Sequence, residues 1–452
     1  FPLAEAGEAH RAVEARTEVG KVTLDWPGTS TVRSVLGAYY LNGSTPVRGY
    51  KTARPIIDGE DKLPTGRYDA LVLVTATRAR VENLRVEDSE GRGIDIAKID
   101  DVEVFGCAVY NTYNAGIHFE KSKGSRAENN FVTGAGIGNR QDGAPWGASL
   151  EAVKSESTVF RNNIVSEVFG EGINAHSGSN NTLIENNYVF GARAVGIYSD
   201  GAPNTIIRRN IVVGTANKTY WRSATSVGAG IALNNEKYHY PAGGGSQSTS
   251  VQSRGVKVYG NLVAYTSAGL AFWGELDQSS FDNVLVYNNT FVDNNTQVTS
   301  SSKPKPGAQF INNVLLSLSS GTKDVDGTKL GGMVARNNYF SQGNPGGDYV
   351  HAGNRFTGLK LAKMSGWRSV TSANQITWRD FAAQGGSTVI GAGDDTPRKS
   401  ADGRNNYNLD HNGAEHDAPM SMGGLSFSTP IGPQAPSSLV VSRRPEFLIV
   451  KL

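Results

Sequence analysis

The chain of 452 residues has one cysteine, almost no net charge and no long apolar segment. The single Cys107 excludes a disulfide within the chain and a cysteine-rich metal site. Lysine and arginine number 44 against 42 aspartates and glutamates, and no long basic run offers a nucleic-acid footprint. No apolar run reaches the ~18 residues of a membrane-spanning helix. We therefore expect neither a disulfide scaffold, nor a nucleic-acid-binding protein, nor a membrane span.

Glycine and asparagine are abundant instead. The chain has 54 glycines and 36 asparagines, and 29 of the asparagines lie between Asn83 and Asn344. Both residues suit turns and left-handed backbone positions. Glycine is not every third residue, which excludes collagen, and a hydrophobic fraction of 38% is too high for a disordered chain. The excess indicates a globular chain with many regularly placed turns.

Two internal repeats run through the chain with a period of about 23 residues. A Gly-Ile-x-apolar pattern starts at Gly93, Gly116, Ser149, Gly172, Gly196, Gly230 and Gly269. A ladder of polar residues follows it at Asn83, Cys107, Asn130, Asn163, Asn187, Asn210, Asn261, Asn289, Asn313 and Asn338. The longer steps fall at the same places in both repeats. They indicate insertions in the segments 130–149, 210–230 and 233–261.

Short apolar alternations within each unit, such as Val102-Glu103-Val104, predict strands rather than helices. One unit cannot bury its apolar face, but stacked units share a continuous core, and an asparagine at the same corner of each unit can hydrogen-bond along the stack. With its paired asparagines, such as Asn129-Asn130 and Asn162-Asn163, the pattern resembles the right-handed parallel β-helix, pectate-lyase-like proteins. The resemblance spans residues 55–345 and implies an all-β, single-stranded solenoid of about ten or more coils.

We expect three segments along the chain. Residues 1–54 form an N-terminal cap with a helix over residues 3–16 and the first strands; residues 55–345 form the β-helix with a catalytic groove. Residues 346–452 form an irregular C-terminal extension with a short helix near Leu359–Trp367. Because the chain starts at Phe1 rather than at a methionine, we expect a processed, secreted or periplasmic protein, and we expect it to be a monomer.

Side chains alternate across a strand, so inward isoleucines predict two outward columns. The first column carries Asp95, His118, Glu151, Asn174 and Tyr198, and the second carries Glu120, Val153, His176, Asp200, Asn234 and Trp273. Lys98, Lys121 and Lys154 follow at the strand ends. Coils stack ~4.8 Å apart, so the polar residues should form one solvent-facing patch. Such crowding of charges marks candidate catalytic residues. The candidates are Lys154, His176, Glu151, His118, Glu120, Tyr198 and Asp200.

The insertions carry aromatic and charged residues that are expected to wall a groove, where sugars stack and acidic groups bind. We expect substrate to contact these residues and their neighbours in the columns. The predicted substrate-binding residues are Lys121, Arg140, Asp142, Trp146, Asn174, Trp221, Arg222, Asn234, Tyr238 and Trp273.

One reaction that fits the patch is β-elimination on a uronic-acid polysaccharide or oligosaccharide. It needs a base for the C5 proton, a neutraliser for the neighbouring carboxylate and an acid for the leaving oxygen. Lys154 is the predicted base, and His176, His118 or Tyr198 is the acid or partner base. The neutraliser is Arg140, with no cofactor required, or a Ca²⁺ held by Glu120 and Glu151.

The stretch Glu151-Ala152-Val153-Lys154-Ser155, followed by Ala175-His176-Ser177-Gly178, resembles the chondroitinase B/alginate lyase family. In that family a Lys-Ser ends one strand and an Arg-His-Gly occupies the next. The resemblance implies a catalytic Lys154 and His176. Ala175 stands where the family has arginine, and only Glu151 is present of the family's paired metal-binding glutamates.

Other functions stay open at this point. A glycoside hydrolase could pair Glu120 with Glu151, or Glu151 with Asp200, and either stereochemical outcome fits the coil spacing. Epimerisation shares the proton-abstraction step. A carbohydrate-binding or structural β-helix is the non-enzymatic alternative, in which Glu151 and Lys154 form a plain ion pair and Asp200 is a turn residue.

Overall fold

The computed structural model describes residues 56–143, 145–236, 253–274, 280–301, 305–326, 332–345, 353–395, 411 and 420–425, and the backbone of four earlier strands. The chain divides into two compact units. The first is Phe1–Tyr188, Ala192–Thr205 and Tyr238–Val251, and the second is Val189–Gly191, Ile206–Lys237 and Gln252–Leu452. The expected helix over residues 3–16 lies outside the described residues, and the expected boundaries at 54/55 and 345/346 stay predictions.

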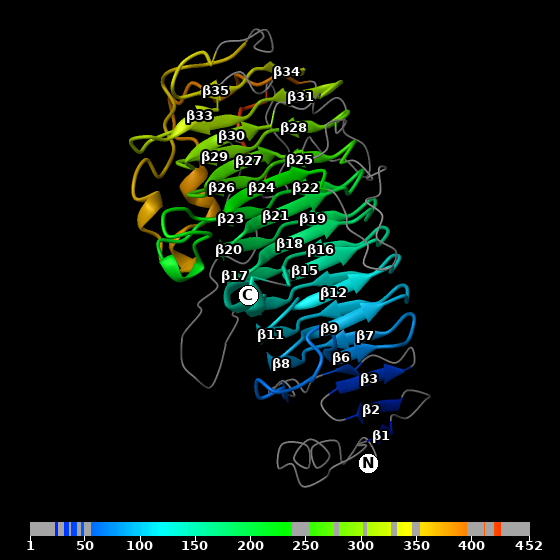
Figure 1. Ribbon diagram of the computed structural model, residues 1–452. Coiled ribbons are helices and arrows are strands. Elements are labelled where there is room, and N and C mark those ends of the chain that lie inside the picture. Colours follow the sequence, from blue (N-terminus) through cyan, green and yellow to red (C-terminus); the bar gives the residue numbers. More distant parts are fainter. Residues whose placement is uncertain are drawn as a thin grey trace. The chain divides into compact units, whose positions relative to one another are not determined.

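The first unit is a stack of coils in which each coil gives one strand to each of three sheets (Figure 1). Sheet A contains β1 (Thr23–Asp25), β2 (Thr31–Val35), β3 (Ala38–Asn42), β6 (Ala70–Val74), β9 (Arg92–Ala97), β12 (Ile117–Glu120), β15 (Ala148–Val153), β18 (Glu171–His176) and β21 (Val195–Asp200). Sheet B contains β4 (Val47–Arg48), β7 (Arg80–Glu82), β10 (Glu103–Phe105), β13 (Arg126–Glu128), β16 (Val159–Arg161) and β19 (Leu183–Glu185). Sheet C contains β5 (Ile56–Asp58), β8 (Arg85–Ser89), β11 (Ala108–Thr112), β14 (Phe131–Thr133) and β17 (Ile164–Val168).

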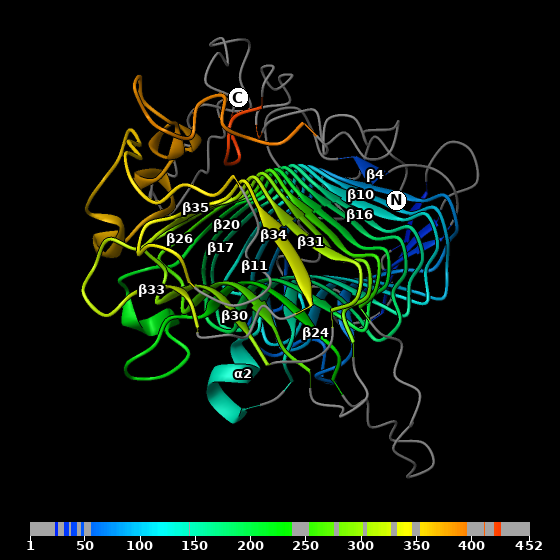
Figure 2. The same cartoon turned by 90° about the horizontal axis from the view of Figure 1, so that it is seen from above.

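Pairing in this unit is parallel from β3 onward, and only β1, β2 and β3 pair antiparallel among its described strands. A six-residue helix, α2 (Ile137–Asp142), occupies the first predicted insertion and projects from the coils (Figure 2). The residues of β20 (Tyr188–Ala192) are divided between the two units.

The second unit repeats the three-sheet arrangement with parallel strands. Its part of sheet A is β24 (Ala229–Asn234), β27 (Ala268–Phe272), β30 (Thr296–Ser300) and β33 (Lys323–Val325). Its part of sheet B is β22 (Ile206–Arg208), β25 (Lys257–Tyr259), β28 (Leu285–Tyr287), β31 (Ala308–Ile311) and β34 (Met333–Arg336). Its part of sheet C is β23 (Ile211–Val213), β26 (Leu262–Ala264), β29 (Thr290–Val292), β32 (Val314–Leu316) and β35 (Tyr339–Phe340). Four short 3₁₀ helices are η2 (Lys218–Tyr220), η3 (Trp367–Ser369), η4 (Ala373–Gln375) and η5 (Trp378–Phe381).

Paired asparagines make the corner between sheets B and C. The first of each pair has a left-handed backbone, with φ of 55° at Asn162, a conformation that asparagine tolerates. The second is buried, and its side chain bridges to the coils above and below. Asn163 Oδ1 accepts from Asn130 N at 2.9 Å, and Asn163 Nδ2 donates to Ala127 O at 2.9 Å. The predicted polar ladder is therefore confirmed as a set of corner hydrogen bonds within each unit.

The predicted ladder of polar residues is wrong at its first position, Asn83. Asn83 is the left-handed turn residue, with φ of 57°, and its amide donates to Phe105 O as the next turn does one coil later. Buried Leu84 takes the ladder position instead. Cys107 occupies the next position of the ladder, where its backbone amide donates to Asn130 Oδ1 at 2.8 Å.

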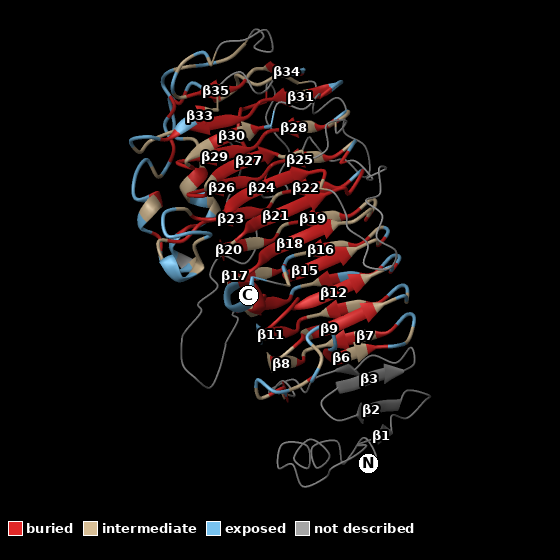
Figure 3. Cartoon of the chain, viewed as in Figure 1, coloured by how far each residue is buried: buried red, intermediate tan, exposed pale blue. Residues whose placement is uncertain are grey.

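Most strand residues of the three sheets are buried (Figure 3), and their inward apolar side chains form the core of each unit. In sheet A of the first unit, Ile94, Ile117, Leu150, Ile173 and Ile197 are completely buried. They stack in register through the parallel pairs of β9, β12, β15, β18 and β21. Because every coil presents its isoleucine or leucine at the same register, the intervening outward residues also align.

The short helix expected near Leu359–Trp367 is wrong. The described residues before Trp367 are not helical, and amides among them bond to another segment instead of to preceding carbonyls. Leu361 pairs antiparallel with Ala383, and Ala362 N donates to Ala382 O at 2.9 Å. Gly366, with φ of 73°, then breaks any helical path before η3. Tertiary pairing overrides the helical preference of this segment.

Candidate active site

Four neighbouring strands of sheet A bring the first predicted column together. Asp95 of β9 pairs with His118 of β12, which pairs with Glu151 of β15, which pairs with Asn174 of β18. The second column is also in register, because Glu120 pairs with Val153, and Val153 with His176. The alignment read from the repeat spacing is confirmed at all these positions.

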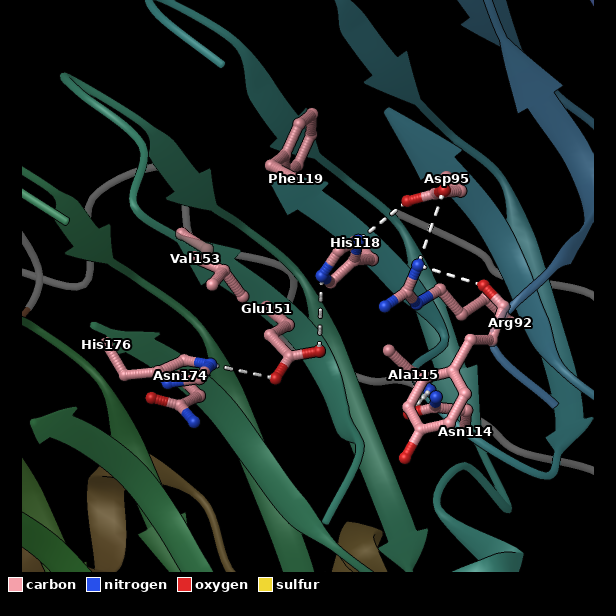
Figure 4. Close-up of polar contacts among 12 residues, drawn as sticks. Arg92, Asp95, Asn114, Ala115, His118, Phe119, Glu151, Val153, Asn174 and His176 are labelled. Atoms are coloured by element: carbon pink, nitrogen blue, oxygen red, sulfur yellow. Dashed lines mark hydrogen bonds and ion pairs between the residues drawn. The ribbon is translucent and has the colours of Figure 1, made fainter. Parts of the chain in front are cut away.

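His118 and Asp95 form a close polar pair within the cluster (Figure 4). His118 Nδ1 lies 2.6 Å from Asp95 Oδ1. Because a carboxylate can only accept, Nδ1 carries a proton and donates it to Asp95. Arg92 Nη1 lies 3.5 Å from Asp95 Oδ2 and holds the carboxylate from its other side. The imidazole of His118 is thus fixed in one tautomer, with Nε2 directed away from Asp95.

Glu151 lies between two histidines. Its Oε1 accepts from His176 Nε2 at 3.0 Å, and its Oε2 lies 3.8 Å from His118 Nε2 (Figure 4). Burial alone would raise the pKa of Glu151, but the hydrogen bond from His176 and the charges of His118, His176 and Arg92 outweigh it, so the pKa is lowered from 4.5. Glu151 is therefore an ionised carboxylate at neutral pH. His176 Nδ1 in turn lies 3.0 Å from Ser177 Oγ.

The expectation that this column faces open solvent is wrong. Of the residue surface, 2% is exposed at His118 and 8% at Glu151, and Asp95, Asn174, Tyr198 and Asp200 are also buried. The His176 side chain is more open, with 22% exposed. Strand alternation predicts that a side chain points away from the coil interior, but it does not predict what lies over it. The outward column is a buried polar network with its accessible end at His176.

Two charged residues of the site were not among the residues predicted from the sequence, and counting back from the outward Asp95 and Asn174 by strict alternation would put them at inward positions. Arg92 and Glu171 begin β9 and β18, three residues before Asp95 and Asn174. Glu171 accepts a short hydrogen bond from Asn174 Nδ2, as Arg92 contacts Asp95. The alternation rule fails at a strand's first residue, because the chain is still turning the corner there. A charge at an apparently inward position was the signal that could have found both.

The lysines predicted at the strand ends lie in left-handed turns. The φ angle is 61° at Lys98, 51° at Lys121 and 51° at Lys154. Asparagine or glycine would suit that backbone better than lysine, so turn geometry alone does not explain the choice. Lys121 Nζ pairs with Glu120 Oε1 at 3.1 Å, half exposed at the end of β12. Lys154 follows β15, the strand that carries Glu151.

The first insertion lies beside this cluster through α2 and the residues that follow it. Arg140 places its guanidinium 5.1 Å from the ring centre of Phe169. Asp142 forms an ion pair of 3.0 Å with Arg67 and accepts from the Tyr113 hydroxyl. Trp146, which precedes β15, is exposed. Of these predicted substrate-binding residues, Arg140 and Asp142 have structural contacts, and Trp146 presents a ring to solvent.

Other predicted substrate-binding residues belong to the second unit. Trp221 Nε1 donates to Thr215 O at 2.7 Å within its own loop, and Arg222 is exposed. Asn234 Nδ2 donates to Glu236 Oε1 at 3.0 Å at the end of β24, and Trp273 follows β27. Tyr238 lies outside the described residues. The site described above therefore rests on the first unit.

A calcium site on Glu120 and Glu151 stays a prediction. The two carboxylates are on different columns and have different partners, Lys121 for Glu120 and His176 for Glu151. Within the described residues, no group of three or more His, Cys, Asp or Glu side chains is arranged to hold a metal ion.

No helix in the described part of the chain is long and apolar enough to span a membrane.

A family model described as a right handed beta helix region matches residues 69–244, the stretch that carries the cluster. The protein is a right-handed parallel β-helix. Among curated proteins, no sequence matches this β-helix.

Solved structures with a similar fold include three of different activity. The A-module of a mannuronan C-5 epimerase of Azotobacter vinelandii is 14% identical, with a TM-score of 0.44 over 65% of this chain and 77% of that one. A pectate lyase is 14% identical, with a TM-score of 0.46 over 83% and 86%. A surface adhesin of Streptococcus pneumoniae is 12% identical, with a TM-score of 0.41 over 65% and 82%. None of these likenesses indicates which reaction this β-helix performs.

The cluster contains groups that can donate and accept protons. It places two imidazoles on either side of one ionised carboxylate, and a second carboxylate sets the tautomer of the buried imidazole. His118 Nδ1 faces Asp95 and its Nε2 faces Glu151, so each nitrogen of the buried ring has a carboxylate partner. Imidazoles and carboxylates in such contact are the groups that general acid–base catalysis uses.

Proposed function

We propose that this β-helix is a polysaccharide lyase, which cleaves a uronic-acid-containing polymer by β-elimination at the Asp95–His118–Glu151–His176 cluster. The observation that carries the proposal is the position of Glu151 between two histidines, at 3.0 Å from His176 and 3.8 Å from His118. Of the three groups that β-elimination needs, the two histidines would supply the base and the acid, and a neutraliser for the uronate carboxylate is the third.

In the proposed reaction, the sugar enters at the accessible His176 end of the otherwise buried network, and His118 Nε2, between Asp95 and Glu151, takes the C5 proton. The electrons of the C5–H bond form the C4=C5 double bond as the C4–O bond breaks. His176 enters the step as an imidazolium, keeps the Nε2 proton that it donates to Glu151, and gives its Nδ1 proton to the leaving oxygen. The Ser177 hydroxyl, 3.0 Å from that nitrogen, shows that an oxygen can sit at hydrogen-bonding distance there. After the product leaves, His118 gives up its extra proton and His176 takes one up at Nδ1, both by exchange with solvent.

Lys154 remains the competing base, since the lysine follows the strand that carries Glu151 and its left-handed backbone is not explained by turn propensity. Lys98 is its matched control, because it ends β9 in the same kind of turn. Changing His118 to alanine should abolish activity, whereas Lys154→Ala and Lys98→Ala should keep most of it. Loss of activity in Lys154→Ala alone would move the base to the lysine.

The test uses the purified chain with a panel of uronate-containing and neutral polysaccharides. A rise in ultraviolet absorbance from the new C4=C5 double bond supports the lyase. Reducing ends without that absorbance contradict it. Binding without any product contradicts it as well, and supports a non-catalytic β-helix. Assays with and without EDTA decide whether Ca²⁺ takes part.

A glycoside hydrolase is the second candidate, and the lowered pKa of Glu151 favours it, because hydrolysis needs one ionised carboxylate as base or nucleophile. Asp95, two coils away in the same column, is the other carboxyl of the cluster. Both carboxyls are held by histidines, which suits proton relay better than a direct attack on the sugar. Reducing ends without the double bond would establish this alternative.

A further inference from the structure

Tyr68 presents its ring to solvent at the edge of the site. With 63% of its surface exposed, it is the most exposed large apolar or aromatic residue among those the structure describes. Single exposed aromatics are common on protein surfaces, so exposure alone carries no meaning. What distinguishes Tyr68 is the rigidity of its backbone and the identity of its neighbour.

The backbone around Tyr68 is held from both sides. Arg67 forms the 3.0 Å ion pair with Asp142 and lies 4.4 Å from the ring centre of Tyr113. Asn114 Nδ2 donates to Arg67 O at 3.2 Å, and Arg92 Nη1 donates to Tyr68 O at 3.0 Å. These contacts fix the main chain while the ring stays outside. An aromatic ring held in this way binds a flat apolar surface with little loss of conformational entropy.

Arg92 links Tyr68 to the acid–base cluster. Its guanidinium lies 5.9 Å from the Tyr68 ring centre, and its Nη1 lies 3.5 Å from Asp95 Oδ2. Arginine has five N–H donors; Arg92 uses Nη1 for its hydrogen bonds in the described part of the chain, its Nε is buried, and Nη2 is the terminal nitrogen left to meet a ligand. A guanidinium with an unused N–H donor group is suited to bind a carboxylate.

We infer that Tyr68 and Arg92 form a subsite for an acidic sugar ring next to the reacting unit. The apolar face of the sugar stacks on the Tyr68 ring, and its carboxylate binds the Arg92 guanidinium. The subsite deepens the proposed function and rests on it for its place in the reaction. The subsite would select a uronate, because a neutral sugar has no carboxylate to pair with the Arg92 guanidinium.

The test measures binding and turnover separately. Binding uses the His118→Ala protein with saturated trisaccharides of galacturonate and mannuronate, and with their carboxyl-reduced counterparts, by calorimetry. In this background Tyr68→Ala should weaken binding of one uronate trisaccharide about 3- to 10-fold, the size of one aromatic contact. Tyr68→Phe should bind normally, and the carboxyl-reduced sugar should bind weakly to the unaltered subsite.

Arg92→Lys keeps the charge but loses the fork geometry, and should also weaken binding. Met364→Ala is the surface control, because Met364 is exposed and belongs to the second unit. It should leave binding and melting temperature unchanged, and Tyr68→Ala should keep its melting temperature too.

Three results would contradict the subsite. The first is that Tyr68→Ala binds the uronate trisaccharide as tightly as the protein that keeps Tyr68. The second is that the carboxyl-reduced sugar binds as tightly as the uronate, and the third is that neither trisaccharide binds. The experiments distinguish failure of the subsite from failure of the proposed lyase function. Eliminase activity with an unchanged KM in Tyr68→Ala removes the subsite and keeps the lyase. Tyr68-dependent binding of the uronate by a protein without eliminase activity keeps the subsite and removes the lyase.

Discussion

His118 Nδ1 donates to Asp95 Oδ1 across 2.6 Å, and both side chains are buried. The contact joins residues 23 positions apart, one coil of the solenoid, because His118 and Asp95 hold the same register in β12 and β9. An imidazole oriented in this way by a buried carboxylate has a defined proton acceptor at Nε2.

Asp95→Asn should therefore disable proton transfer without disturbing the fold. The amide would present a donor to Nδ1, and the imidazole would move its proton to Nε2, where the acceptor is needed. We expect kcat to fall by ~10²–10⁴-fold, the range typical of a lost tautomer-setting carboxylate. Steady-state kinetics on the substrate found in the panel measure it. Asp101→Asn, at an exposed turn one strand away, should keep full activity. An unchanged kcat in Asp95→Asn would remove His118 from the base position.

Glu151→Gln should change how stability depends on pH. The folded pKa of Glu151 is lowered, so its contribution is present above the unfolded pKa of about 4.5 and is lost as pH falls through the folded value. Unaltered protein should exceed Glu151→Gln in melting temperature at pH 7, and the gap should narrow as pH falls below 4.5. Melting curves from pH 7 to acid measure this gap. A gap that is constant with pH would mean that Glu151 is not held ionised by its histidine partners.

Asn163 and Asn162 should respond oppositely to substitution. Asn163→Ala removes buried hydrogen bonds to the coils on both sides and leaves main-chain groups unpaired, at a cost of about 2–4 kcal/mol in the free energy of unfolding. Asn162 is exposed with φ of 55°, a conformation that glycine adopts freely, so Asn162→Gly should change stability by less than about 0.5 kcal/mol. Chemical denaturation measures both. Similar losses in the two variants would argue against the ladder as the stabilising element.

Lys305→Met should stabilise the protein at neutral pH. Lys305 is 1% exposed, with Nζ 5.6 Å from the Phe272 ring centre, and burial lowers its pKa to about 8. Below pH 8 the folded state must carry a buried charge, so the penalty is fully present there and is relieved as pH rises toward 10.5. The melting temperature of Lys305→Met should exceed that of the unaltered protein at pH 7, and the difference should shrink by pH 10. A difference that grows with pH would contradict this assignment.

The repeat spacing predicted the fold because main-chain pairing in a parallel solenoid is periodic. Each coil offers its neighbour the same hydrogen bonds, so a residue one period away along the chain is a neighbour in space. Ile94 over Ile117, and His118 beside Asp95 and Glu151, follow from counting alone. Counting residues along the repeat failed where the period is locally broken, since the first position of the ladder is Leu84 and not Asn83. The helix predicted near Leu359–Trp367 was also wrong, because Leu361 in that segment pairs with Ala383.

The sequence by itself thus determined the β-helix, the register of its coils and the gathering of His118, Glu151 and His176, since all three depend on backbone periodicity. The tertiary structure decided the rest of the site. Side-chain torsions turn Arg92 toward Asp95 and His176 toward Glu151, and burial converts an expected open patch into a network with one accessible end. Those features depend on segments distant in the chain, such as the one that carries Tyr68, whose packing no local spacing encodes.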